Sequence, residues 1–174
     1  MPALEVEGTP GSSPSKSDSV GRVVTVGTIL LGVGLGGFFD GIVLHQILQW
    51  HHMLSAHTPP DSLKDLELNT LADGLFHGAT WVLSVVGVLL VWNGLSKGAS
   101  AGWARLLGGI LTGWGAFNVV EGFVDHHLLG VHHVRPGPDE LVYDVGFIAW
   151  GAAMLAAGIF LLRDRTTETA RNSG

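Results

Sequence analysis

Cysteine is absent from the 174-residue chain, and charged residues are scarce. Without cysteine there is no disulfide, no thiolate metal ligand and no cysteine nucleophile. Charged residues account for 14% of the chain, against about 25% in soluble domains. No run of basic residues indicates nucleic acid as a partner. The His-Glu-x-x-His motif of zinc peptidases and the Gly-x-Ser-x-Gly motif of serine hydrolases are also missing.

Hydrophobic residues, by contrast, make up 47% of the chain, and its mean hydropathy is +0.39. The 26 glycines suit transmembrane helices that pack closely. Four apolar stretches are long enough to cross about 30 Å of hydrocarbon as helices. They cover residues 23–50, 71–95, 103–129 and 141–162. The sequence therefore predicts an all-α integral membrane protein whose four transmembrane helices form a four-helix bundle in the lipid bilayer.

The predicted transmembrane domain spans residues 23–163, between a disordered cytoplasmic tail at 1–22 and a second cytoplasmic tail at 164–174. Basic residues near the helix ends set its predicted orientation. One side carries Arg22, Lys97, Arg105, Arg163 and Arg165, and the other side carries Lys64 and Arg135. By the positive-inside rule both termini are cytoplasmic, and the two longer loops face the extracytoplasmic side.

An acid, a glycine and three histidines occur twice, and every matched pair has the same offset along the chain. The first copy is Asp40-Gly41-x-x-x-His45 with His51-His52, and the second is Glu121-Gly122-x-x-x-His126 with His132-His133. In the spans that follow, Asp73 corresponds to Asp144. The sequence therefore predicts a duplicated two-helix hairpin, with repeat one at 23–95 and repeat two at 103–163, related by an axis along the membrane normal.

The repeated acids and histidines are expected at the outer ends of the helices, where they can meet. An acid inside a span costs roughly 2.5–3.5 kcal/mol on insertion scales, and no basic residue lies within the spans to pair with it. Nitrogen and oxygen ligands from several helices can instead bind a metal at one depth. The predicted metal ligands and their close partners are Asp40, His45, His51, His52, Asp73, His77, Glu121, Asp125, His126, His132, His133 and Asp144.

Helical spacing groups these residues further. On an α-helix Glu121, Asp125 and His132 fall on one stripe, whereas His126 falls on a neighbouring stripe. Plainer roles compete with metal binding, because buried acids can hydrogen-bond between helices and paired histidines can titrate near neutral pH. His57 is interpreted as an ordinary loop residue, and for His127 packing and ligation explain the residue equally well.

Imidazole and carboxylate ligands together suit Fe, Cu(II), Zn or Mn. Haem held by His45 and His126 is a less favoured cofactor, because haem needs no group of buried acids beside it. We therefore keep three functions: a metal-dependent oxidoreductase, a transition-metal transporter or accessory protein, and a small b-type cytochrome. The inner halves of the first and third spans are almost purely apolar, which argues against a permeation path. Helix faces rich in glycine would also allow close packing against a second copy of the chain, as a homo-oligomer, or against a membrane partner protein.

Two segments resemble a known family. They are Gly37-Phe38-Phe39-Asp40-Gly41-Ile42-Val43-Leu44-His45-Gln46 and Glu121-Gly122-Phe123-Val124-Asp125-His126, the latter followed by His132-His133. Both are similar to an uncharacterised family of bacterial predicted membrane proteins, domain of unknown function 2243. The resemblance covers nearly everything after the N-terminal tail. It implies a protein of the bacterial inner (plasma) membrane and no particular activity.

Overall fold

A computed structural model describes the backbone of residues 16–172 and the side chains of residues 18–163, and this part of the chain is helical with no strand. The elements are α1 (Lys16–Phe38) with a π-helical extension η1 (Phe39–Ile47), α2 (Leu63–Ser96), α3 (Trp103–Glu121) with a second extension η2 (Gly122–Leu128), and α4 (Glu140–Asn172). The prediction of an all-helical protein with four long helices is confirmed.

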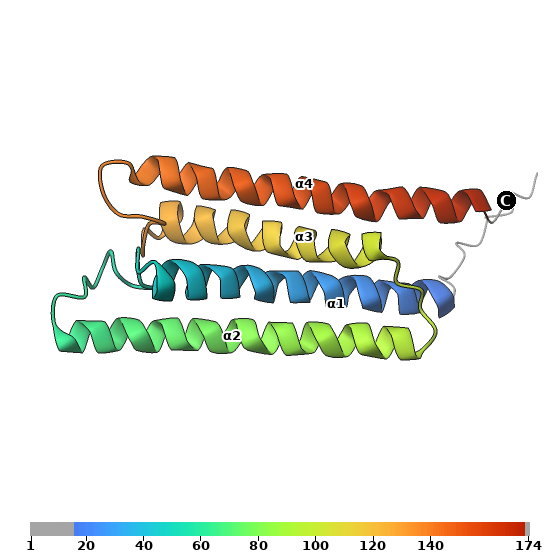
Figure 1. The fold of residues 1–174 in the computed structure, drawn as a ribbon, viewed down its shortest axis with the longest axis horizontal. Coiled ribbons are helices and arrows are strands. Elements are labelled where there is room, and N and C mark those ends of the chain that lie inside the picture. The colour runs from blue at the N-terminus through green and yellow to red at the C-terminus, as the bar shows by residue number, and fades with distance from the viewer. Residues whose placement is uncertain (1–15, 173–174) are drawn as a thin grey trace, which may run out of the picture.

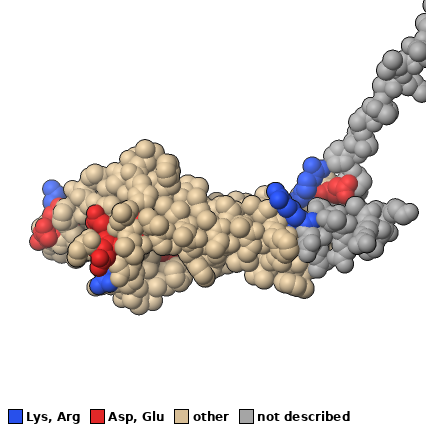
Figure 2. Space-filling view, turned by 90° about the horizontal axis from the view of Figure 1, so that it is seen from above, with Lys and Arg blue, Asp and Glu red and all other residues tan. Residues whose placement is uncertain are grey.

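Three helices are long and apolar enough to cross a membrane: Asp18–Ile47, Leu63–Ser96 and Glu140–Arg163. The helix α3 with its extension, which the sequence predicts as the third span, does not reach the same hydropathy. Its glycines, together with Asn118 and Glu121, reduce its apolar character. On the face shown in Figure 2, charged side chains gather at the two ends of the molecule and the surface between them carries none.

The helices lie side by side in the order α2, α1, α3, α4 (Figure 1). Within residues 16–172, α1 packs on α2 and α3, α3 packs on α4, and α2 and α4 do not meet. The four helices thus form an open row, an arrangement that the predicted four-helix bundle did not specify. The physical reason is that α1 and α3 each carry glycines on two faces, so each can pack closely against two neighbours.

The two long connections lie at one end of the row, together with η1 and η2 (Figure 1). The opposite end carries the short turn between α2 and α3 and the start of α1. The buried histidines and acids of residues 18–163 all come from the first of these ends, in η1, the last residue of α3, η2, the two long connections and the first turns of α2 and α4.

Helical structure extends further along the chain than predicted. The helix α1 begins at Lys16, inside the tail predicted at 1–22, and Asp18 in its first turn interacts favourably with the helix dipole. The helix α4 continues to Asn172, inside the tail predicted at 164–174. The remaining parts of both predicted tails lie outside the described residues. The helix α2 begins at Leu63 because the Ser62 side chain accepts a hydrogen bond from the Asp65 backbone N–H at 3.2 Å.

Glycine is required where α1 crosses α3. A Cβ at Gly113 would clash with the carbonyl oxygen of Ile29, and a Cβ at Gly32 would clash with that of Ile110. We predict that Gly113→Leu destabilises the protein by more than the roughly 1–3 kcal/mol typical of overpacking, measured as a lower unfolding temperature in detergent. Gly78→Leu is the matched control, because nothing lies within 4 Å of a Cβ at that position. Equal unfolding temperatures for the two variants would contradict the close crossing.

Candidate metal centre

Both central helices widen into a π-helix before they end. In η1 the hydrogen bonds run to the fifth residue back, as in the 2.8 Å bond from the Leu48 N–H to the Val43 carbonyl. Such turns occur frequently at functional sites. Because the turn is wider, residues five apart face the same way. Asp40 and His45 therefore meet, with 3.1 Å between Oδ2 and Nε2.

The same widening in η2 brings Glu121 to His126, with 3.1 Å between Oε1 and Nε2. Regular α-helical spacing predicts instead that Glu121 shares its stripe with Asp125. The wider turn moves Asp125 off this face, where it is half-buried and its carboxylate makes no hydrogen bond or ion pair with any residue of 18–163. The predicted stripe was therefore wrong for Asp125, whereas Glu121 and His132, which it also grouped together, do meet.

Two further histidines enter from the long connections, and each is held by the opposite connection. The Nδ1–H of His51 donates to the Val134 carbonyl at 2.8 Å, and the Nδ1–H of His132 donates to the Met53 carbonyl at 3.2 Å. A carbonyl oxygen only accepts, so in both rings Nδ1 carries a proton, and a neutral ring then keeps the lone pair on Nε2. The Nε2 atom of His132 lies 2.9 Å from Glu121 Oε1.

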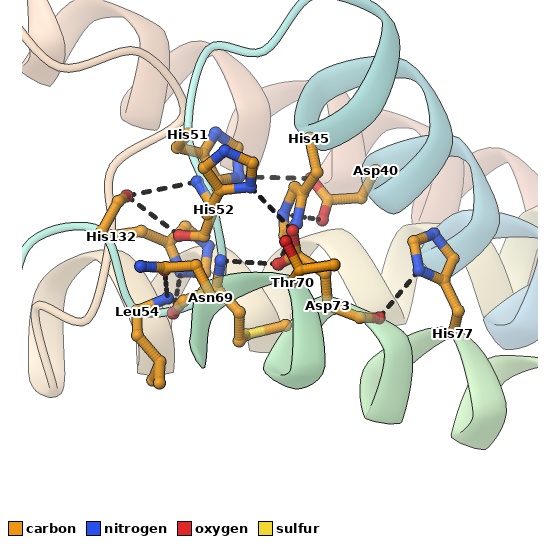
Figure 3. Close-up of polar contacts among 12 residues, drawn as sticks. Asp40, His45, His51, His52, Leu54, Asn69, Thr70, Asp73, His77 and His132 are labelled. Atoms are coloured by element: carbon orange, nitrogen blue, oxygen red, sulfur yellow. Dashed lines mark hydrogen bonds and ion pairs between the residues drawn. The ribbon is translucent and has the colours of Figure 1, made fainter. Parts of the chain in front are cut away.

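Asp73, near the start of α2, orients the first set of histidines (Figure 3). Its Oδ1 lies 3.0 Å from His45 Nδ1 and accepts the Met53 backbone N–H at 2.8 Å, while its Oδ2 lies 2.8 Å from His52 Nδ1. A carboxylate on Nδ1 fixes the tautomer in which Nε2 is free to bind a metal, and metal-bound histidines almost always have such a partner.

Asp144, in the first turns of α4, takes the corresponding place in the second set, although its contact with His126 is not a hydrogen bond. Its Oδ1 lies 3.4 Å from His126 Nδ1 and accepts the Val134 backbone N–H at 2.9 Å, while its Oδ2 lies 2.7 Å from His133 Nδ1. Each contact of Asp73 thus has a counterpart at Asp144. The histidine and backbone positions keep the constant offset of the repeat, whereas the two acids are closer together in sequence because the second long connection is shorter.

Six side chains converge at the centre of this arrangement, and each is at most 6% exposed. They are Asp40, His45, His51, Glu121, His126 and His132. Two overlapping groups have ligand atoms that all lie within 4.8 Å of one another, namely His45 with His51 and His132, and Glu121 with His126 and His132. We call these six residues the central cluster.

Many of the converging atoms have no hydrogen-bond partner. Both Asp40 oxygens, Glu121 Oε2 and the Nε2 atoms of His45, His51 and His126 are buried and make no hydrogen bond, although most of them lie within ion-pair distance of one another. Buried polar atoms without a partner are rare in proteins, and each calls for an explanation such as a bound ion. A cation among these atoms would satisfy all of them together.

The electrostatic setting also favours a cation. Four buried side chains are acids: Asp40, Asp73, Glu121 and Asp144. No lysine or arginine among residues 18–163 is buried with them. Burial, together with the nearby rings of His132 and His45, lowers the pKa of His51 to about 2, so its imidazole is neutral at pH 7 and its Nε2 lone pair is available.

The remaining predicted residues take outer positions. His52 and His133 are partly exposed and bind the outer oxygens of Asp73 and Asp144. His77 points away from the central cluster (Figure 3), because its Nδ1 lies 2.7 Å from the Asp73 backbone carbonyl and its Nε2 lies against Gly41. His57, interpreted as a loop residue, and His127, for which packing and ligation explained the residue equally well, are both exposed.

Sequence reasoning missed an aromatic cluster beside the centre. The Arg135 guanidinium lies 5.5 Å from the Trp50 ring and 5.3 Å from the Tyr143 ring, and its Nη1 donates to the Tyr143 hydroxyl at 2.6 Å. It also missed Asn69, whose side chain binds backbone groups of Leu54 and Thr58 and so fixes the first long connection. A signal was present for the cluster, since Trp50 directly precedes His51 and Tyr143 directly precedes Asp144.

The comparisons with known proteins identify a family only. Residues 27–165 match the sequence model of a family described as "Predicted membrane protein (DUF2243)". Neither a curated protein nor a solved structure gave a significant match.

Proposed function

The chain belongs to the DUF2243 family of predicted membrane proteins, and from this premise we propose that it is an integral membrane protein whose central cluster binds transition-metal ions for a redox reaction. The observation that carries the proposal is the convergence of unpaired, buried histidine nitrogens and carboxylate oxygens. The Nδ1 contacts of the four central histidines support it, because they leave every Nε2 facing inward.

We further propose that all four helices cross the bacterial inner membrane and that the central cluster lies near its extracytoplasmic face. The basic residues Arg22, Lys97 and Arg105, at the end of the row opposite the cluster, support cytoplasmic termini. The matching contacts of Asp73 and Asp144 support an origin by duplication of a two-helix hairpin. Cysteine insertions labelled from outside intact cells would test the orientation.

The set of donors supports redox chemistry. Each half contributes two histidines and one carboxylate, and two histidines with one carboxylate hold iron in many oxygen-activating enzymes while leaving coordination positions open. An ion held in this way would exchange electrons with a small molecule and polarise it. The protein's part is to hold the neutral imidazoles, to orient them through Asp73 and Asp144, and to exclude water with buried surroundings.

Two other functions find less support. A permeation path between α1 and α3 is disfavoured because backbone atoms of the two helices meet at Gly32 and Gly113. This close crossing lies between the central cluster and the opposite end of the row. A haem held by His45 and His126 is disfavoured because the rings of His51 and His132 occupy the space between them. His51 lies 4.3 Å from His45 and His132 lies 4.9 Å from His126, measured between ring centroids.

The test is elemental analysis of protein purified in detergent without chelators. We expect stoichiometric Fe, Mn, Cu or Zn in the wild type, a clear loss in His126→Ala, and the wild-type amount in His127→Ala. His127 is the matched control because it is adjacent to His126 but exposed. A wild type without metal would refute the proposal. If zinc were the only metal found, the proposed redox reaction would be refuted, because zinc has no redox chemistry, but the proposed metal binding would be supported.

Substitution of an acid that orients the histidines should weaken metal binding without abolishing it. Asp73→Asn should weaken metal binding about 10–100-fold, as expected for the partner of a metal-bound histidine. The neutral amide cannot accept as strongly from His45 and His52, so His45 is held less firmly. Competition with a fluorescent chelator measures the affinity. Asp61→Asn, in the exposed loop before α2, should leave the affinity unchanged.

A further inference from the structure

We infer that the centre binds two divalent transition-metal ions, one in each half of the molecule, and not a single ion shared by all four histidines. The inference rests on the metal binding proposed above and specifies its number and ligands. In the first half the ligands would be Asp40, His45 and His51, and in the second half Glu121, His126 and His132.

The ring planes of His51 and His132 separate the two ions. These imidazoles are stacked, with 4.5 Å between centroids and 6° between planes. An ion bound to Nε2 lies close to the plane of its ring, since the nitrogen lone pair lies in that plane. Two stacked and nearly parallel planes do not meet within bonding distance. The two rings therefore cannot hold one ion together, although each can hold its own.

The other ring pairs assign each connection histidine to its own half. His45 and His51 are 4.3 Å apart at 69°, and His126 and His132 are 4.9 Å apart at 72°. Two imidazoles that share one ion have centroids about 4.5–5.2 Å apart, given metal–nitrogen bonds near 2.0–2.1 Å. The pair His126 and His132 falls within this range, and the pair His45 and His51 lies just below it. The distance alone also admits His51 with His132, which only their parallel ring planes argue against. The pairs that cross between halves are longer, at 5.8 Å for His45 with His132 and 6.4 Å for His51 with His126.

The carboxylates follow the same division. The Oδ2 of Asp40 lies 3.1 Å from His45 Nε2 and its Oδ1 lies 4.0 Å from His51 Nε2. Oε1 of Glu121 lies 3.1 Å from His126 Nε2 and 2.9 Å from His132 Nε2. Ligand atoms on one ion are about 3 Å apart. By distance His132 also lies near the first half, but its contact with Glu121 and its ring plane assign it to the second.

The buried charge matches two divalent ions when the histidines are neutral, as they must be to bind metal. The four buried acids around the centre, Asp40, Asp73, Glu121 and Asp144, carry four negative charges when ionised. No buried lysine or arginine among residues 18–163 compensates for them. Two divalent ions supply four positive charges, whereas one ion leaves two negative charges uncompensated in an apolar surrounding, which is strongly unfavourable.

Titration of the metal-free, full-length protein with Co²⁺ tests the inference, because Co²⁺ bound by nitrogen and oxygen ligands absorbs visible light. We expect the absorption to saturate at two Co²⁺ per chain in the wild type and in the control His127→Ala. His45→Ala and His126→Ala should each saturate at one, because each loses one half of the centre and keeps the other.

X-ray absorption of the Co²⁺-loaded wild type keeps the inference testable if a variant does not fold. We expect a cobalt–cobalt distance of about 3.5–4 Å, as in other two-metal sites. Saturation at one Co²⁺ in the wild type, without a cobalt–cobalt distance, would overturn the two-ion inference and leave the proposed metal binding intact. Wild-type protein that binds no Co²⁺, Fe²⁺ or Zn²⁺ would overturn both.

Discussion

Stripping the bound ions with a chelator is expected to lower the unfolding temperature of the detergent-solubilised protein by about 10 °C, given two general relations. A ligand that binds only the folded state at about 1,000 times its dissociation constant contributes about 4 kcal/mol. For a chain of this size each kcal/mol corresponds to roughly 2–4 °C. The emission of the six tryptophans reports unfolding, and returning the metal should restore the original temperature.

The control for this experiment is His126→Ala together with His45→Ala, which removes a ligand from each half. Its unfolding temperature should not respond to chelator or to added metal. If the wild type unfolds at the same temperature with and without chelator, the buried acids are neutralised in another way. The metal would then not be part of the folded structure.

Glu121→Gln is expected to change stability in opposite directions with and without metal. In the stripped protein Glu121 is a buried acid with one unpaired oxygen, and its neighbours are the rings of His126 and His132 with no lysine or arginine. With both rings neutral, removing its charge should raise the unfolding temperature. In the metal-loaded protein the same change removes a ligand. It should weaken binding by more than the roughly 10–100-fold expected for an outer partner such as Asp73.

The sign reversal separates a metal site from a hydrogen-bonded cluster. If Glu121 served only to hydrogen-bond His126 and His132, the substitution would change stability in the same direction whether or not metal was added. Glu67→Gln, an exposed acid on α2, is the matched control and should have little effect in either state. Thermal unfolding with chelator and with added Fe²⁺ measures all four conditions.

Hydropathy and the internal pattern predicted most of the elements and the residues of the centre. The four apolar stretches correspond to the four long helices, because an apolar stretch of that length buries its backbone only as a helix. The constant offset of the repeat selected Asp40, His45, Glu121 and His126 as candidate ligands, and these residues form the inner contacts. The informative signal was that an acid, a glycine and three histidines occur twice at one constant offset.

Sequence spacing could not predict the π-helices, and that is why Asp125 was placed on the stripe of Glu121. Nothing in the local residues marks the point at which the hydrogen bonds change from four residues back to five. The crossed bonds of His51 to Val134 and of His132 to Met53 also lay beyond prediction. They join connections that are far apart in the sequence and that meet only once α1 and α3 have packed.

Crystals of the unchelated protein allow the most direct test, which is an anomalous difference map recorded at the absorption edge of the metal found by elemental analysis. The account predicts two peaks among the Nε2 atoms of His45, His51, His126 and His132, one beside Asp40 and one beside Glu121. The absence of any peak among these six side chains, with the metal bound elsewhere or not at all, would contradict it.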